Sequence, residues 1–164
     1  MQTDFKVRER EPMTVVSKHT PVRMANIGAV IGASFAEVYG ALGPTGAASG
    51  EPFVIYHGSP SGDDPPFEIE ICAPTVRAVT PPHGWNVTEL PAGTFASVLH
   101  VGAYDSLSTA YDELGAWIGR QGFAIVGPPR EVYLSEPSTP AAETRTVVEF
   151  PVVASTAAVP VAIS

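Results

Sequence analysis

Apolar residues recur along the chain at helical spacing in two segments. Between residues 25 and 42 they stand three or four positions apart, as on one face of a helix: Ile27, Ile31, Phe35, Val38 and Leu42. The same spacing returns between residues 104 and 121: Leu107, Tyr111, Leu114 and Ile118. Gly43-Pro44 follows the first segment and Gly122 the second, and both are typical of helix ends. We therefore expect two helices, at about 25–42 and 104–121.

Short runs of β-branched and aromatic residues predict strands in the rest of the chain. In residues 67–71 apolar and acidic side chains alternate, which is the pattern of a half-buried strand. The other runs are bounded by proline, glycine or polar loops. The predicted strands cover residues 13–19, 52–56, 67–71, 95–100, 131–134 and 144–153.

The order strand, helix, strand, strand occurs twice, which indicates an internal duplication. Pro52, Tyr56 and Pro74 recur 77 positions later. His19 and His100 form a further pair at a spacing of 81, at equivalent strand ends. A single half cannot cover both faces of its own strands, so the halves should share one sheet.

We therefore expect an α+β fold: one antiparallel sheet built by both halves, with both helices on one face. A ligand cleft is expected on the opposite face, at the pseudo-two-fold seam. The domain is assigned to residues 1–153, with halves at about 4–80 and 85–153. Residues 154–164 form an apolar, uncharged tail, which either frays or docks on a partner.

The charge balance argues against nucleic-acid binding. The 164 residues contain 9 Lys and Arg against 17 Asp and Glu, a net charge of −8 that repels phosphate backbones. Five of the basic residues precede residue 25, so from there on 4 basic residues oppose 14 acidic ones. A concave site in that stretch should favour cations, although most of the carboxylates are expected to lie on a solvated surface.

Other chemistries find little support in the sequence. The single cysteine, Cys72, lies in an apolar run and is expected to be a small buried residue. No phosphate-binding glycine motif, nucleophile elbow, helical histidine pair or mixed histidine and carboxylate cluster appears at ligand spacing. We therefore expect no metal and no cofactor. The N-terminal residues lack the apolar core of a signal peptide, which favours a cytoplasmic protein without membrane contact.

Several segments of the chain resemble the GyrI-like small-molecule-binding family. They include residues 89–104, from Glu89-Leu-Pro-Ala-Gly-Thr-Phe to Tyr104, and residues 129–134, Pro-Arg-Glu-Val-Tyr-Leu. In the first half, residues 16–20, 52–57 and 67–74 match the corresponding strands of the family. The likeness runs from about residue 4 to residue 153 and rests on the order and spacing of these segments.

The resemblance implies several functions without choosing among them. The family includes effector domains of multidrug-responsive activators, gyrase-inhibitory proteins, stand-alone binders and hydrolases of cyclopropane-containing toxins. Because the match begins almost at residue 4, the 164 residues leave no room for a DNA-reading helix-turn-helix, and we expect a stand-alone member. A protein partner or a second copy of the chain remains open.

Glu131 is the first candidate site residue. It resembles the family glutamate at the floor of the ligand cleft, and it lies two residues before Tyr133, so both side chains project to one face of a strand. The duplication places Val54 and Tyr56 at equivalent points across the seam. A carboxylate beside two tyrosines suits a flat aromatic cation. The alternatives are a surface ion pair for Glu131 and ordinary sheet packing for the tyrosines.

Three further residues are weighed as ligand contacts. Glu70 resembles an acidic position of the family. Trp85 follows a Pro-Pro-His-Gly loop and would either cover the cleft or cover an edge of the core. Tyr104 precedes the second helix, from where its hydroxyl could reach the end of the cleft.

Two functions remain open at this point. The first is a binder of amphipathic aromatic or cationic compounds, with Glu131 and the neighbouring aromatic residues as contacts. The second is a hydrolase in which Glu131 acts as base or nucleophile and Tyr133 or Tyr104 donates a proton. Inhibition of a larger enzyme is a weaker third possibility, implied only by the gyrase-inhibitory relatives.

Overall fold

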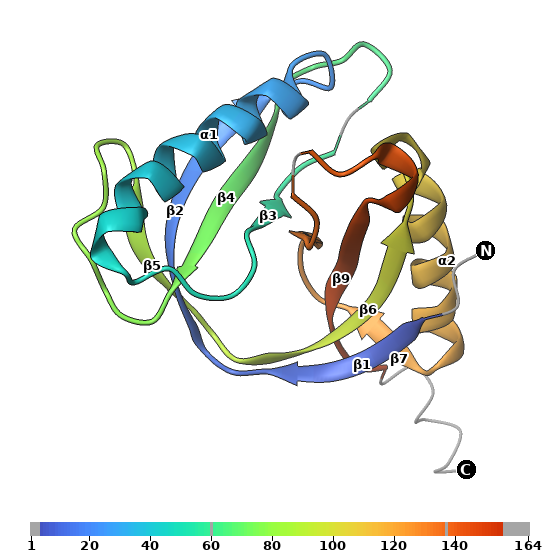
Figure 1. Cartoon of the computed structure of the whole chain (residues 1–164). Coiled ribbons are helices and arrows are strands. Elements are labelled where there is room, and N and C mark those ends of the chain that lie inside the picture. Colours follow the sequence, from blue (N-terminus) through green and yellow to red (C-terminus); the bar gives the residue numbers. More distant parts are fainter. Residues whose placement is uncertain (1–3, 60, 137, 156–164) are drawn as a thin grey trace.

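The computed structural model describes residues 4–59, 61–136 and 138–155 (Figure 1). It confirms the α+β prediction: within these residues, nine antiparallel strands form the sheet and two α-helices accompany it. The helices and strands are β1 (Phe5–Arg10), β2 (Met13–Val22), α1 (Ile27–Leu42), β3 (Phe53–Tyr56), β4 (Phe67–Thr75), β5 (Asn86–Leu90), β6 (Gly93–Val101), α2 (Leu107–Arg120), β7 (Phe123–Ile125), β8 (Arg130–Tyr133) and β9 (Arg145–Ala154).

The pairing of β3 with β8 joins the two halves. Along the sheet the strands follow the order β1-β6-β9-β8-β3-β4-β2-β5, with β7 beside β9. At the junction Val54 lies opposite Glu131, and Phe53 lies opposite Val132. Val54 and Glu131 are 131 − 54 = 77 positions apart, which is the spacing of the duplication. The pseudo-two-fold axis therefore passes through this one cross-strand pair.

The halves also exchange their first strands. β1 pairs with β6 of the second half, and β5 pairs with β2 of the first half. Val16 of β2 and Ala96 of β6 both belong to the cores beneath the helices, so they share a face of the sheet, and equivalent residues of these two strands are 96 − 16 = 80 positions apart. The expected equivalence of His19 and His100 at a spacing of 81 is therefore wrong by one residue. Because neighbouring residues of a strand point to opposite faces, that shift separates the two histidines chemically.

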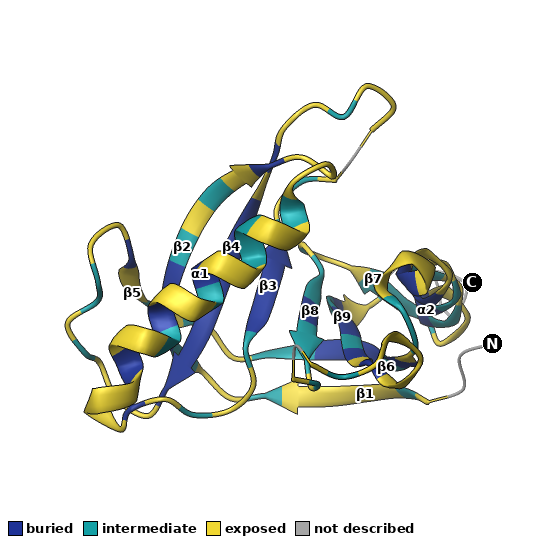
Figure 2. Cartoon of the chain, turned by 45° about the horizontal axis from the view of Figure 1, so that its top comes forward, coloured by how far each residue is buried: buried dark blue, intermediate teal, exposed yellow. Residues whose placement is uncertain are grey.

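Both helices cover the same face of the sheet, as expected. Directly opposed residues of antiparallel strands share a face, and one such row runs across both halves: Val98, Val148, Glu131, Val54 and Ile71. Val54 and Ile71 belong to the core that packs against α1, whereas Val98 and Val148 belong to the core with the buried α2 residues. Figure 2 shows buried positions on the sheet between the helices and exposed positions on the outer side of α1.

Three strands were missed by the sequence patterns. β1, β5 and β7 lie at sheet edges or beside β9 only, and β1 and β5 carry charged or polar side chains at most positions. Edge strands do not need the apolar pattern of central ones, so their sequences resemble loops. The second helix begins at Leu107 because residues Tyr104–Ser106 form a separate 3₁₀ turn. Gly122 follows α2 with a φ of +80°, the left-handed conformation typical of a helix end.

One segment, Ile27–Thr45, is long and apolar enough to cross a membrane by length and composition alone. It contains α1, which buries Ser34, Val38 and Leu42. Core helices pass the same test, so this is weak support for a span. The cytoplasmic location and the absence of membrane contact stay predictions. Ala154 ends β9, and the backbone N–H of Ser155 donates to Gly122 O; the remainder of the expected tail, 156–164, lies outside the described residues.

Leu114→Ala should destabilise the protein by about 2–5 kcal/mol, because the side chain is fully buried between α2 and the sheet. Asp112→Ala, at an exposed position of the same helix, should change the free energy of unfolding by less than about 0.5 kcal/mol. Urea denaturation of both variants measures the difference. Equal losses in the two variants would contradict the packing described for α2.

Candidate ligand-binding site

Glu131 is buried on the helix-bearing face of the sheet and is surrounded by tyrosine hydroxyls. Only 7% of its surface is exposed. The hydroxyls of Tyr56 and Tyr133 donate to its Oε1 at 3.0 and 2.9 Å, and that of Tyr111 donates to Oε2 at 2.5 Å. We call these four residues the tyrosine–glutamate cluster. A carboxylate loses its hydrogen bonds to water when it is buried, and these three hydroxyl donors replace them.

The three tyrosines of the cluster come from three different elements, and Glu131 shares β8 with Tyr133. Tyr56 ends β3, Tyr133 ends β8 and Tyr111 lies on the sheet-facing side of α2. Tyr56 and Tyr133 are equivalent by the 77-residue duplication, and their hydroxyl oxygens are 3.1 Å apart. The pseudo-two-fold axis thus brings two equivalent phenols to a carboxylate that lies on the axis itself.

Further aromatic rings extend the cluster toward both helices. Phe35 of α1 and Tyr104 each meet the ring of Tyr133 edge to face, with centroid distances of 6.2 and 6.1 Å. Val54 is fully buried opposite Glu131. Tyr104 is 55% exposed, so it lies where the cluster meets solvent. Aromatic rings beside a carboxylate, with one partly exposed ring, are suited to an aromatic cation.

The electrostatics of the cluster follow from burial and from one negative charge. Burial, together with the carboxylate of Glu131, raises the pKa of Tyr56, Tyr111 and Tyr133 well above the usual value for a phenol. The pKa of Tyr104 is raised by the same two causes. These four phenols therefore remain neutral hydrogen-bond donors across the physiological pH range.

The expected cleft and the expected site residues lie on different faces of the sheet. A cavity lies on the face opposite the helices, where the cleft was expected, but Glu131, Tyr133, Tyr56 and Val54 lie on the helix-bearing face. The reason is the register at the seam, which places Glu131 in the same row as the core valines beneath the helices. A ligand of Glu131 must therefore enter from the helix side.

Two of the expected contacts do not join this cluster. Glu70 lies opposite Ile55, one position along β3 from Val54, so its side chain is on the other face of the sheet. Trp85 is only 4% exposed and packs in the core with the residues beneath α1, where its Nε1 donates to Glu37 at 2.9 Å. Trp85 therefore covers an edge of the core and does not cover the cleft, which were the two alternatives for this residue.

Tyr111 and Phe35 pack against the cores beneath the helices, as their spacing predicted, and they also contact the candidate site through Glu131 and Tyr133. Their positions at intervals of four along a helix are equally typical of packing residues, so no local pattern distinguishes the two roles. Only the fold shows that both helices face the seam. The buried position of Cys72 is as expected, and burial raises the pKa of its thiol.

A cavity of about 470 Å³ lies on the face opposite the helices. Its lining includes Phe53, Arg10, Arg130 and Glu149 and none of the tyrosine–glutamate cluster. Glu149 is fully buried, accepts a hydrogen bond from Arg10 at 2.7 Å and lies 3.9 Å from Arg130. The arginines thus compensate this second buried carboxylate, whereas Glu131 is satisfied by neutral donors.

The sequence patterns also missed a histidine and carboxylate cluster. His19, His57 and Glu70 come from three neighbouring strand regions, and one potential ligand atom of each lies within 4.8 Å of the others. The statement that no such cluster occurs was therefore wrong for the folded chain. Residues far apart in sequence cannot show ligand spacing before the sheet register is known.

A protein-family model matches nearly the whole chain. Residues 3–153 match the GyrI-like small molecule binding domain. The chain belongs to the GyrI-like family. It is therefore a small-molecule-binding domain by family, as the resemblance implied. A search of the curated proteins finds no match.

Several solved structures share the fold. The C-terminal domain of EcmrR has a TM-score of 0.76 at 24% identity, covering 92% of this chain and 98% of that one. A hydrolase from Listeria innocua has a TM-score of 0.68 at 10% identity, covering 93% of both chains. SAV2435 bound to tetraphenylphosphonium has a TM-score of 0.63 at 14% identity, covering 92% and 94%. At these identities the likeness establishes the fold of this GyrI-like chain.

Glu131→Gln should lower the pH at which the cluster tyrosines and Tyr104 ionise, because it removes the negative charge beside them. Tyr39 is an internal control: burial, Glu51 and Cys72 raise its pKa to about 12, so the substitution should leave it unchanged. Ultraviolet titration of tyrosinate checks both expectations. Identical titrations of the two proteins would contradict the role given to Glu131.

Raised phenol pKa values also predict how stability depends on pH. The folded state holds these protons more tightly than the unfolded state, whose tyrosines ionise near pH 10. The stabilisation is fully present below about pH 10 and is lost as pH rises from there toward the folded-state pKa values. Urea denaturation between pH 8 and pH 11 should give a free energy of unfolding that falls only in the upper part of this range. A constant value throughout would contradict it.

Proposed function

We propose that this domain binds hydrophobic aromatic cations and acts by sequestering such compounds or by regulating a partner. The observation that carries the proposal is the buried carboxylate of Glu131, held by three neutral phenols among aromatic rings. A cation that reaches it gains a buried opposite charge and ring faces in one place. The fold likeness to SAV2435 bound to tetraphenylphosphonium supports this class of ligand.

The energetics favour a cation over a neutral ligand. Each contact between a cation and an aromatic face contributes about 0.5–2 kcal/mol, and the larger values apply to desolvated sites. Glu131 is already desolvated, so a cation partly neutralises a charge that the fold keeps away from water. A neutral aromatic compound gains only the apolar and stacking contribution.

Binding requires a rearrangement of the cluster. The hydroxyls of Tyr56, Tyr111 and Tyr133 contact the carboxylate directly, so a cation reaches Glu131 only when at least one phenol turns aside. Tyr104 is the most exposed ring at this place and contacts Tyr133. We assign the entrance to the Tyr104 side, between the two helices.

Glu131→Gln should weaken tetraphenylphosphonium binding by roughly tenfold or more, the equivalent of about 1.4 kcal/mol. Binding of the neutral triphenylphosphine oxide should change much less. Isothermal titration calorimetry measures both ligands. Glu11→Gln is the matched control, because it changes the net charge equally at an exposed position. Equal losses of the two ligands in Glu131→Gln would overturn the proposal.

A hydrolase is the second candidate, favoured by the short contacts between a carboxylate and hydroxyl donors. Glu131 would take a proton from a water molecule as the water oxygen bonds to a carbon of a strained cyclopropane. The ring C–C bond breaks, and a phenol of the cluster protonates the departing carbon, so that water is added across the bond. The proton on Glu131 then returns to the phenolate, which restores both groups. Attack by the carboxylate itself, followed by ester hydrolysis, is the alternative route. The fold likeness to the Listeria innocua hydrolase supports testing it.

Turnover distinguishes the two candidates. A hydrolase should consume many equivalents of a cyclopropane-bearing alkylating agent, with a product heavier by one water, and Glu131→Gln should abolish the reaction. Mass spectrometry of the compound and of the protein measures both. Reversible recovery of the unchanged compound, or equal consumption by Glu131→Gln, would exclude the hydrolase.

A further inference from the structure

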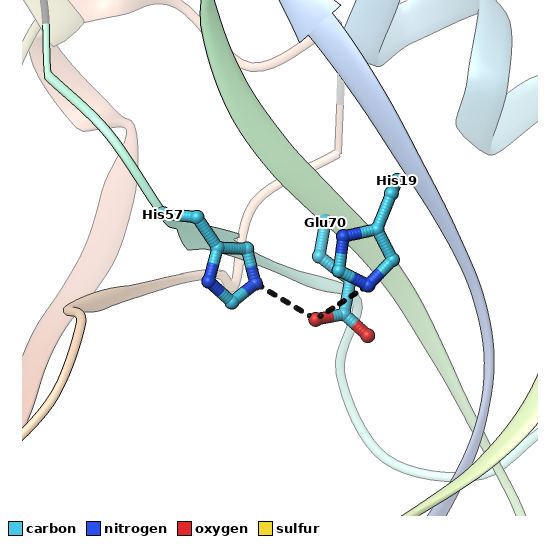
Figure 3. Close-up of side chains that lie close together, drawn as sticks. All are labelled: His19, His57 and Glu70. Atoms are coloured by element: carbon cyan, nitrogen blue, oxygen red, sulfur yellow. Dashed lines mark hydrogen bonds and ion pairs between the residues drawn. The ribbon is translucent and has the colours of Figure 1, made fainter.

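His19, His57 and Glu70 form a compact group on the sheet face opposite the helices (Figure 3). His19 lies on β2 directly opposite Glu70 of β4, and His57 follows the end of β3. β2, β4 and β3 are neighbours in the sheet, so the group spans three adjacent strand regions. Glu70 is on the opposite face from Glu131, and this group is therefore separate from the tyrosine–glutamate cluster.

Both imidazoles direct a nitrogen at the same carboxylate oxygen. His57 Nε2 lies 2.9 Å from Glu70 Oε1, and His19 Nε2 lies 3.4 Å from that oxygen. The donor atoms of a tetrahedral zinc ion, about 2.0–2.2 Å from the metal, lie about 3.3 Å from one another. The two observed separations fall on either side of this value. The three potential ligand atoms all lie within 4.8 Å of one another, so the exposed imidazoles would close around an ion held by Glu70.

A second carboxylate orients one of the imidazoles. His19 Nδ1 lies 2.9 Å from Glu68 Oε2, within hydrogen-bond distance. A neutral imidazole that donates from Nδ1 presents a lone pair at Nε2, and here that lone pair faces the carboxylate of Glu70. Two acceptors facing each other repel unless a proton or a metal ion lies between them. A carboxylate that holds the far nitrogen of a coordinating histidine is the usual outer contact of a metal site.

Burial gives the group one fixed ligand and two adjustable ones. The side chain of Glu70 is 7% exposed, whereas those of His19 and His57 are 50% and 32% exposed. The imidazole rings lie nearly parallel, with a centroid distance of 5.2 Å and an angle of 19° between planes. The buried carboxylate thus defines the position of an ion, and the exposed imidazoles can close on it from solvent.

We propose that His19, His57 and Glu70 bind a divalent transition-metal ion, with Zn²⁺ as the best match. Two imidazole nitrogens and one carboxylate oxygen are ligands that Zn²⁺ accepts, and three protein ligands leave a position for water. The bound ion links three strand regions of the first half on the face away from Glu131. The proposal is independent of the function assigned to the tyrosine–glutamate cluster.

Titration of the full chain, without a histidine tag, with Zn²⁺ tests the proposal. Isothermal titration calorimetry should give one saturable site per chain, and Co²⁺ should give the visible absorption of a site with nitrogen and oxygen ligands. His19→Ala and His57→Ala should each weaken the site at least tenfold. Both positions are exposed, so circular dichroism should show folded variants.

Two further variants sharpen the result. His83→Ala, at an exposed histidine outside the group, should leave the affinity unchanged. Glu68→Gln should weaken the site by about 10- to 100-fold through the orientation of His19. Absence of saturable binding, or an affinity that His19→Ala and His57→Ala leave unchanged, would overturn the proposal. Loss of tetraphenylphosphonium binding would not affect it, since that ligand belongs to the other face.

Discussion

The structure depends on the cross-strand pair of Val54 and Glu131, where the two halves meet. This pair lies on the pseudo-two-fold axis, so the seam holds an apolar side chain on one strand and a carboxylate on its equivalent. A buried carboxylate without partners would destabilise the sheet at its centre. The hydroxyls of Tyr56, Tyr111 and Tyr133 remove that penalty and tie α2 to both seam strands. The proposed ligand chemistry rests on the same contacts.

The two faces of the sheet satisfy their buried carboxylates in different ways. On the helix-bearing face neutral phenols surround Glu131, so its negative charge remains available to a cation. On the other face Arg10 and Arg130 lie against Glu149 and compensate it. Cys72 is the equivalent of Glu149 at the 77-residue spacing, so the duplicated halves have diverged at this buried position as well as at Val54 and Glu131. Because of this divergence, each face of the sheet holds one buried carboxylate from the second half that has no counterpart in the first half.

Much of the fold was predictable because periodicity reflects burial. The apolar spacing of both helices and of the central strands survives in the structure, and the repeated prolines and tyrosines located the seam. The edge strands β1 and β5 were not predictable, since solvent on one side removes the apolar pattern. Their exchange between halves depends on long-range pairing that no local pattern encodes.

The candidate site was predictable only along single strands. Glu131 and Tyr133 share a face because they are two residues apart, and the duplication added Tyr56 and Val54. The face to which they point depends on the register of the strands. The register also places Glu70 on the opposite face from Glu131, so the prediction that both carboxylates line one cleft was wrong. Tyr111 could not be distinguished from a packing residue, and the group of His19, His57 and Glu70 exists only after three strand regions align.

The position of a bound cation tests the central claim most directly. A crystal structure of the chain with tetraphenylphosphonium should place the phosphorus on the helix-bearing face, between α1 and α2, with at least one phenol turned away from Glu131. A cation in the cavity beside Arg130 and Glu149, with the tyrosine–glutamate cluster unchanged, would contradict the account.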